Sequence, residues 1–120
     1  MIIHTLDVTS DNGVPFRVLA IPASVEGPNR HRAPAKRDHA IVEFYDRRYP
    51  HEPEVGGQFT GGYYDIRTLL DLPGGYGSGR IGDRGGLSLD GGIPAWTVDA
   101  EAASLVADWL EQLLSRGLLD

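Results

Sequence analysis

Cysteine is absent from this 120-residue chain, and lysine nearly so, since Lys36 is the single lysine among eleven basic residues. Without thiols, the chain cannot form disulfides, cysteine-ligated zinc sites, iron–sulfur clusters or a cysteine nucleophile. A chain without disulfides suits the cytoplasm, where we expect this protein. The G-x-x-x-x-G-K-[ST] motif is also absent, which excludes a phosphate-binding loop of that kind.

Long apolar runs are missing as well. No run approaches the roughly 18–20 apolar residues of a membrane-spanning helix. Residues 1–7 contain no basic region followed by an apolar stretch, which a signal peptide requires. We therefore expect neither a membrane span nor a cleaved leader.

Positive charge is in deficit, because 17 acidic residues outnumber 11 basic ones and give a net charge of −6. General nucleic-acid binding depends on neutralising phosphates, so we do not expect it here. The charge is uneven: residues 30–48 carry six basic and three acidic side chains, whereas residues 49–120 carry four and eleven. This polarity favours a mixed-charge protein interface over imitation of a nucleic acid.

Length and glycine content indicate the organisation of the chain. One domain over residues 1–120 is expected, because domains usually have about 100–150 residues. Nine of the 16 glycines lie in residues 74–92, which we interpret as a glycine-rich insertion. Residues 22–38 contain three prolines and several arginines, and they are predicted to form a basic loop, because proline cannot donate to a strand ladder.

Alternation of apolar and polar residues predicts strands over residues 2–8, 14–18 and 39–46. The third is rich in β-branched and aromatic residues, which is typical of a strand in the middle of a sheet.

The first two strands are predicted to form a hairpin whose three-residue loop ends at Gly13 in a left-handed conformation. This loop places Val8 opposite Phe16 and Leu6 opposite Val18, so both apolar sets share one face. A register shift of one residue would separate the two sets.

Apolar residues recur at helical spacing in two later segments. In the first, they predict a short helix over residues 60–71, with Thr60 as its N-cap and Tyr63 facing the core. In the second, Asp99 is the predicted N-cap and Gly117 follows the helix end. The apolar stripe of this final helix consists of Ala102, Leu105, Val106, Trp109, Leu110 and Leu113.

One or two short strands, around residues 87–89 and 93–98, complete the predicted elements. The predicted order is three strands, a helix, one or two short strands and a final helix. This order indicates the α+β class, with an antiparallel sheet of about three to five strands and helices packed on one face.

Two segments contain residues that are found in cofactor or metal sites, but their context does not favour either kind of site. Residues 77–82 match G-x-G-x-x-G, but they follow a predicted helix instead of a strand, so we interpret them as a turn-rich loop. Residues 51–54 and Asp46 offer a histidine and carboxylates, but the four histidines lack the spacing of a metal site. We therefore expect no cofactor and no metal.

An enzymatic alternative would use Asp46, Arg48 and His51 on a phosphate or nucleotide ligand. It requires a pocket that joins these groups to the glycine-rich insertion. No serine stands in an evident nucleophile–base arrangement, so we favour a protein that is not an enzyme.

Several short motifs resemble those of small uncharacterised proteins from bacteria, phages and other mobile elements. They are E-F-Y-D-R-R-Y at residues 43–49, G-Q-F at 57–59, Y-Y at 63–64, T-L-L at 68–70 and L-S-L-D-G-G-I-P-A-W at 87–96. The resemblance implies no catalytic residue. It implies a binder that blocks host machinery, such as an anti-CRISPR or other anti-defence inhibitor.

We therefore expect an interaction module, acting as an inhibitor or regulator, that binds a protein such as a nucleic-acid-binding host complex. An acidic surface is attracted to basic grooves, and aromatic side chains suit interfaces. The expected contact residues are Glu52, Glu54, Tyr64, Asp65 and Asp83, with Arg47 and Arg48 as secondary anchors and Tyr76 also at the surface. A homodimeric module is the other alternative, in which the late leucines either meet a second copy or extend the core: Leu114, Leu118 and Leu119.

Overall fold

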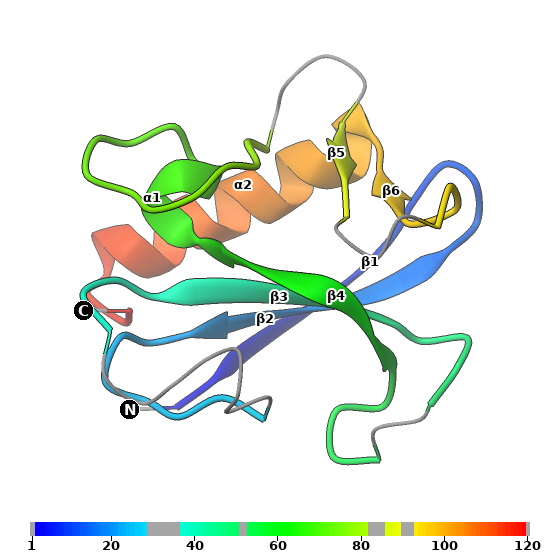
Figure 1. The fold of residues 1–120 in the computed structure, drawn as a ribbon, viewed down its shortest axis with the longest axis horizontal. Coiled ribbons are helices and arrows are strands. Elements are labelled where there is room, and N and C mark those ends of the chain that lie inside the picture. Colours follow the sequence, from blue (N-terminus) through cyan, green and yellow to red (C-terminus); the bar gives the residue numbers. More distant parts are fainter. Residues whose placement is uncertain (1, 29–36, 51–52, 82–85, 90–92, 120) are drawn as a thin grey trace.

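The α+β class is confirmed by the structure, a computed structural model that describes residues 2–28, 37–50, 53–81, 86–89 and 93–119. Four strands form an antiparallel sheet in the order β1-β2-β3-β4, and the long helix α2 lies across one of its faces (Figure 1). Strands β5 and β6 form a separate small sheet. The elements are β1 His4–Thr9, β2 Pro15–Ile21, β3 Ile41–Asp46, β4 Gln58–Asp65, α1 Ile66–Leu69, β5 Leu87–Ser88, β6 Thr97–Val98 and α2 Ala100–Ser115.

The predicted hairpin of β1 and β2 is confirmed, including its register. Val8 pairs with Phe16 and Leu6 with Val18, and Gly13 has a φ of 86°. All four paired side chains belong to or pack against the cluster beneath α2. Burial on one face therefore selects the register, as the alternation predicts.

Strand β3 lies in the middle of the sheet between β2 and β4, and all six of its residues are buried. Its alternation divides the side chains between the two faces. Val42 and Phe44 join the cluster beneath α2, whereas Ile41 and Tyr45 join a second, smaller cluster on the opposite face.

The predicted helix over residues 60–71 is wrong for its first half. Strand β4 extends through Asp65, and only the four residues of α1 are helical. Thr60 donates its hydroxyl to the Phe44 carbonyl at 2.8 Å, and Asp65 caps α1 by accepting from the Arg67 backbone N–H at 2.8 Å. Two glycines weaken a helix here, and pairing with β3 supplies the hydrogen bonds instead.

Helix α2 begins and ends as predicted, and four of the six residues of its predicted stripe are buried: Ala102, Val106, Leu110 and Leu113. Asp99 accepts from the Ala102 backbone N–H at 3.0 Å, and Gly117 has a φ of 68°. Leu105, predicted to face the core, is 57% exposed, whereas Ala103 is buried in its place. The contact of α2 with β1 determines which residues face inward.

The leucines that follow α2 mainly extend the core. Leu119 is fully buried and Leu114 packs partly against the main cluster, while Leu118 stays exposed. Most of the apolar surface of these leucines, which the homodimer alternative would use, is therefore buried within the chain. Neither of the two helices in the described parts of the chain has the length and apolarity needed to cross a membrane.

Candidate functional site

The face of the sheet opposite α2 is covered by loops and carries the candidate site. Its apolar cluster is small: Leu19, Ile21, Ile41, Tyr45 and Val55. Two cavities open on this face, one at each end of the cluster. Side chains that alternate outward from all four strands therefore meet loop residues here instead of a helix.

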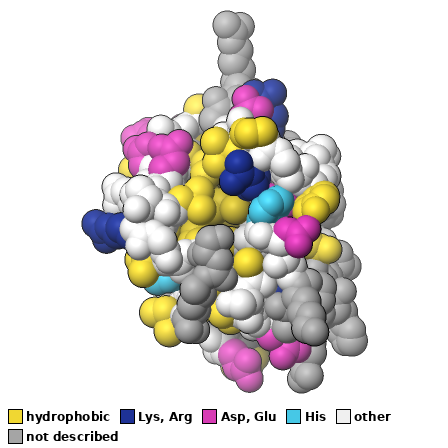
Figure 2. Space-filling view, turned by 90° about the vertical axis from the view of Figure 1, so that its left-hand side faces the viewer, with side chains coloured by type: hydrophobic (Ala, Val, Ile, Leu, Met, Phe, Trp, Pro, Cys, Tyr) yellow, Lys and Arg dark blue, Asp and Glu magenta, His cyan; other side chains and the backbone are white. Residues whose placement is uncertain are grey.

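The first cavity, here named the tyrosine cavity, lies where β3 begins and β4 ends. Its volume is about 530 Å³. Figure 2 shows this end of the molecule, where hydrophobic side chains gather in a hollow with basic, acidic and histidine side chains around it. The cavity is lined by Arg37, Asp38, His39, Ile41, Tyr63, Asp65, Tyr76 and Gly77.

Pairing between β3 and β4 brings these residues together. Ile41 pairs with Asp65 and Glu43 with Tyr63, so the β4 side chains lie beside those that begin β3. The paired residues are at least twenty positions apart in the sequence, and the tyrosine cavity exists because the two strands are neighbours.

The exposure of two adjacent tyrosines is the reverse of the prediction. Tyr63 is 43% exposed at the cavity, whereas Tyr64 is 3% exposed and packs edge-on against Phe44 with ring centroids 5.8 Å apart. Helical spacing had assigned Tyr63 to the core, but strand alternation directs it outward. Tyr64 is therefore a core residue, and Tyr63 replaces it as the surface aromatic.

Asp65 is a predicted contact residue that holds the cavity wall together. Its carboxylate lies 2.8 Å from His39 Nδ1 and also accepts from the backbone N–H groups of Arg67 at 2.8 Å and Tyr76 at 3.3 Å. It thereby joins β3, α1 and the loop that carries Tyr76. Asp65 orients the site more than it offers its own oxygens to a ligand.

Tyr76 forms the outer wall, and at 63% it is the most exposed aromatic side chain of this cavity. Its hydroxyl donates to Asp38 Oδ2 at 2.6 Å, and its ring stacks on His39 with centroids 5.5 Å apart. This hydrogen bond and the charge of Asp38 raise the pKa of Tyr76. The rim is therefore aromatic and acidic.

Arg37, which is half-buried, directs its guanidinium toward the backbone of residues 21–25. Its Nη2 donates to the carbonyls of Pro22 at 2.6 Å and Val25 at 2.9 Å, which holds this loop against the sheet. Burial lowers the pKa of Arg37, and the charge of Glu43 opposes that effect. The predicted basic loop, residues 22–38, is thus anchored at its end; residues 29–36 lie outside the described part.

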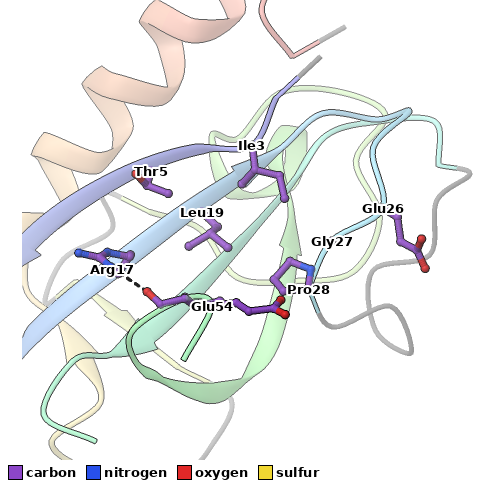
Figure 3. A pocket seen from close by; sticks show the side chains of 9 residues that line it. Ile3, Thr5, Arg17, Leu19, Glu26, Gly27, Pro28 and Glu54 are labelled. Carbon is purple, nitrogen blue, oxygen red and sulfur yellow. Dashed lines mark hydrogen bonds between the residues drawn. The ribbon is translucent and has the colours of Figure 1, made fainter. Parts of the chain in front are cut away.

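The second cavity, here named the glutamate cavity, has a volume of about 540 Å³ beside β1 and β2 (Figure 3). Glu26 and Glu54 reach it from two separate loops. Glu54 is one of the predicted contact residues. The full lining is Ile3, Thr5, Arg17, Leu19, Glu26, Gly27, Pro28, Glu54 and Val55.

Arg17 connects the walls of the glutamate cavity. It binds Asp7 through Nε at 2.8 Å and Nη2 at 3.0 Å, and its Nη1 donates to the Val55 carbonyl at 2.8 Å. The hydrogen bond from Arg17 lowers the pKa of Asp7. Arg47, a predicted anchor, also approaches Asp7 at 3.3 Å. The positive charge of Arg17 is therefore already matched, and the cavity rim is acidic.

Asp46 and Arg48, proposed for enzymatic chemistry, pair with each other away from both cavities. The buried Asp46 carboxylate accepts from Arg48 Nη2 at 2.8 Å and from Trp96 Nε1 at 2.8 Å. Burial alone would raise the pKa of Asp46, but these hydrogen bonds outweigh it and hold the pKa below its ordinary value. The hydrogen bond from Trp96, which immediately precedes β6, fastens the small sheet to β3, and neither Asp46 nor Arg48 lines either cavity.

Some predicted residues lie outside the described part of the chain: Glu52, Asp83 and His51. Within the described ranges, no group of three or more histidine and acidic side chains is arranged to hold a metal ion. Sequence reasoning missed Asp38 and His39, although their position just before a buried strand was a usable signal.

Comparison with known proteins identifies no relative: no family model, no curated protein and no solved structure matches the chain.

Proposed function

We propose that this protein is a non-enzymatic interaction module, an inhibitor or regulator that binds a protein partner through the face opposite α2. The observation that carries the proposal is the tyrosine cavity. Two exposed tyrosines, Tyr63 and Tyr76, stand there beside Asp38 and Asp65, on a face that loops cover.

Physical chemistry supports this assignment. Tyrosine is favoured at interfaces because it buries a large apolar area and keeps a polar tip. The cavity walls are held by hydrogen bonds before any partner arrives, which reduces the entropy lost on binding. The net charge of −6 accelerates encounter with a basic surface, such as that of a nucleic-acid-binding host complex. The proposal includes a cytoplasmic location, which the lack of cysteine supports.

The enzymatic alternative receives less support. The Asp46 carboxylate accepts hydrogen bonds from Arg48 and Trp96, so it stabilises the fold. The resemblance of several motifs to small uncharacterised bacterial, phage and mobile-element proteins implies a binder of the anti-defence kind, and the same experiment tests it.

The proposal is tested by affinity capture from the native host followed by mass spectrometry. A Tyr63→Ser/Tyr76→Ser double variant should lose the partner that the wild type retains. Tyr49→Ser is the matched control, because Tyr49 is 46% exposed but lines neither cavity. A partner retained equally by all three proteins would contradict the proposal.

Charge reversal provides a second arm. Glu54→Lys should weaken capture, because Glu54 is exposed at the rim of the glutamate cavity. Glu111→Lys, a reversal on the exposed side of α2, changes the net charge equally and should leave capture intact. Equal weakening by both would assign the effect to long-range charge and not to this face.

A further inference from the structure

Strand β1 forms one edge of the four-stranded sheet. Among the residues that the structure describes, it pairs with β2 alone. Its six residues pair without a break from His4 to Thr9. An unbroken edge strand presents a row of backbone groups to any extended chain that lies beside it.

The hydrogen-bond pattern identifies which groups face outward. Ser10 N–H donates to the Val14 carbonyl, and antiparallel ladders alternate from such a pair. Leu6 and Val8 therefore bond to β2, whereas the backbone groups of Thr5, Asp7 and Thr9 point away from it. These three residues are exposed, and their backbone groups have no hydrogen-bond partner among the residues that the structure describes.

Features that normally protect edge strands are missing from β1. It contains neither proline nor lysine, and its pairing shows no bulge, whereas the pairing of β4, the other edge, is shifted between Glu43 and Tyr45. The one carboxylate of β1, Asp7, is neutralised by Arg17 and approached by Arg47. Charge on β1 therefore does little to repel an incoming strand.

The glutamate cavity lies directly beside this edge. Thr5 lines it from β1, Leu19 and Val55 contribute buried apolar side chains, and Glu54 extends its carboxylate along it (Figure 3). In an added strand, alternate side chains lie on this face of the sheet, about 4.8 Å from β1. A long basic side chain in that position is directed toward the cavity, where its methylenes meet these apolar side chains and its charge meets the carboxylate of Glu54.

We propose that the edge of β1 accepts an extended basic segment of the partner protein as a fifth strand, with an arginine or lysine entering the glutamate cavity. This is strand addition, in which backbone hydrogen bonds provide affinity and pockets for alternate side chains provide specificity. The inference rests on the proposed function in one respect, namely that the partner is a protein. A basic segment is favoured over a second copy of this chain, because a second copy carries the same acidic rim.

The test uses a defined probe, a ten-residue acetylated and amidated peptide that alternates valine and arginine. Its counterparts replace each arginine by glutamate or methylate alternate backbone nitrogens. The first peptide should bind saturably, with each counterpart at least about tenfold weaker. No saturable binding up to about 1 mM, or equal affinity for the glutamate peptide, would overturn the proposal.

Amide hydrogen exchange measured by NMR gives a residue-level readout on the wild-type protein. In the free protein, the amides of Leu6 and Val8 should be protected, and those of Thr5, Asp7 and Thr9 should exchange rapidly. The arginine peptide should protect these last three. Peptide binding without that protection would overturn the proposal, as would protection in the free protein that grows with protein concentration, which would identify a second copy as the occupant.

Variants locate the site further. Thr5→Pro removes one outward N–H without touching the ladder to β2 and should weaken the peptide at least about tenfold. Thr5→Ala keeps that N–H and should bind like the wild type. Glu54→Gln should weaken the preference for arginine over glutamate. Equal binding by Thr5→Pro and Thr5→Ala would count against the edge.

The two proposals fail separately. Tyr63→Ser/Tyr76→Ser should leave the peptide affinity unchanged, because the tyrosine cavity lies at the other end of the face. If Tyr63→Ser/Tyr76→Ser loses the partner but Thr5→Pro captures it as well as the wild type does, the strand-addition proposal is contradicted and the proposed function is supported.

Discussion

The two faces of the sheet are covered in different ways, and the difference separates stability from recognition. Beneath α2, strands, helices and the small sheet share one continuous apolar cluster. On the opposite face, five buried residues form a smaller cluster, and loops leave two cavities of similar size. A helix can present a complementary apolar stripe along a whole sheet, whereas loops contact it at a few points and leave polar groups at the surface.

Truncating a buried aromatic side chain should reveal the largest difference in stability between the two faces of the sheet. Phe44→Ala, beneath α2, should lower the free energy of unfolding by about 3–5 kcal/mol, because the fully buried ring leaves a cavity. Phe59→Ala, partly buried on the loop-covered face, should lower it by about 1–2 kcal/mol. Urea unfolding measures both values. Equal losses would show that the two faces contribute alike.

The helix-covered side should also be intolerant of a single added methyl group. In Gly86→Ala, the new Cβ would lie 2.0 Å from the Val98 carbonyl oxygen, and φ is +84°. We expect a loss of at least about 2 kcal/mol. Gly13→Ala is the matched control, because its φ is +86° but nothing lies within 4 Å, and about 1 kcal/mol is expected. Thermal unfolding that ranks the two equally would place no close contact at Gly86.

Acid should destabilise the protein through carboxylates whose pKa values are lowered in the fold. The pKa of Asp46 is lowered by Arg48 and Trp96 against the effect of burial, and the pKa of Asp7 is lowered by Arg17. The stability that each contributes is complete above its ordinary pKa of 3.8 and is lost as pH falls through the lower folded-state pKa. Melting temperature measured down to about pH 2 should fall steeply below about pH 4.

Asp46→Asn should make this acid-induced fall shallower by removing one of the titrating groups. An equally steep fall in the variant would assign the acid sensitivity to other carboxylates. Asp108→Asn, on the exposed surface of α2, is the control and should leave the slope unchanged.

Local patterns were sufficient for much of the fold. The enrichment of β3 in β-branched and aromatic residues predicted its central position, and burial of both apolar sets on one face predicted the register that pairs Val8 with Phe16. The first half of segment 60–71 was misassigned as helix, because the apolar residues fit helical spacing, while the hydrogen bonds that make residues 60–65 a strand come from β3, which is distant in sequence.

The same error hid the candidate site. Once residues 58–65 are read as a strand, Tyr63 turns outward and Tyr64 inward, and Asp65 comes beside His39. Glu54, a predicted contact residue, is exposed, but its cavity depends on loop residues 26–28, whose approach no local pattern indicates. Local sequence therefore predicted which residue types were available, and long-range pairing determined where they meet.

We expect the face beneath α2 to provide stability and the opposite face to provide recognition. This expectation is tested most directly by measuring both partner capture and melting temperature on the Tyr63→Ser/Tyr76→Ser variant. Both side chains are well exposed, so the melting temperature should remain within a few degrees of the wild type. Capture of the host partner should be lost. A variant that melts like the wild type and still captures the partner undiminished would contradict the assignment of recognition to this face.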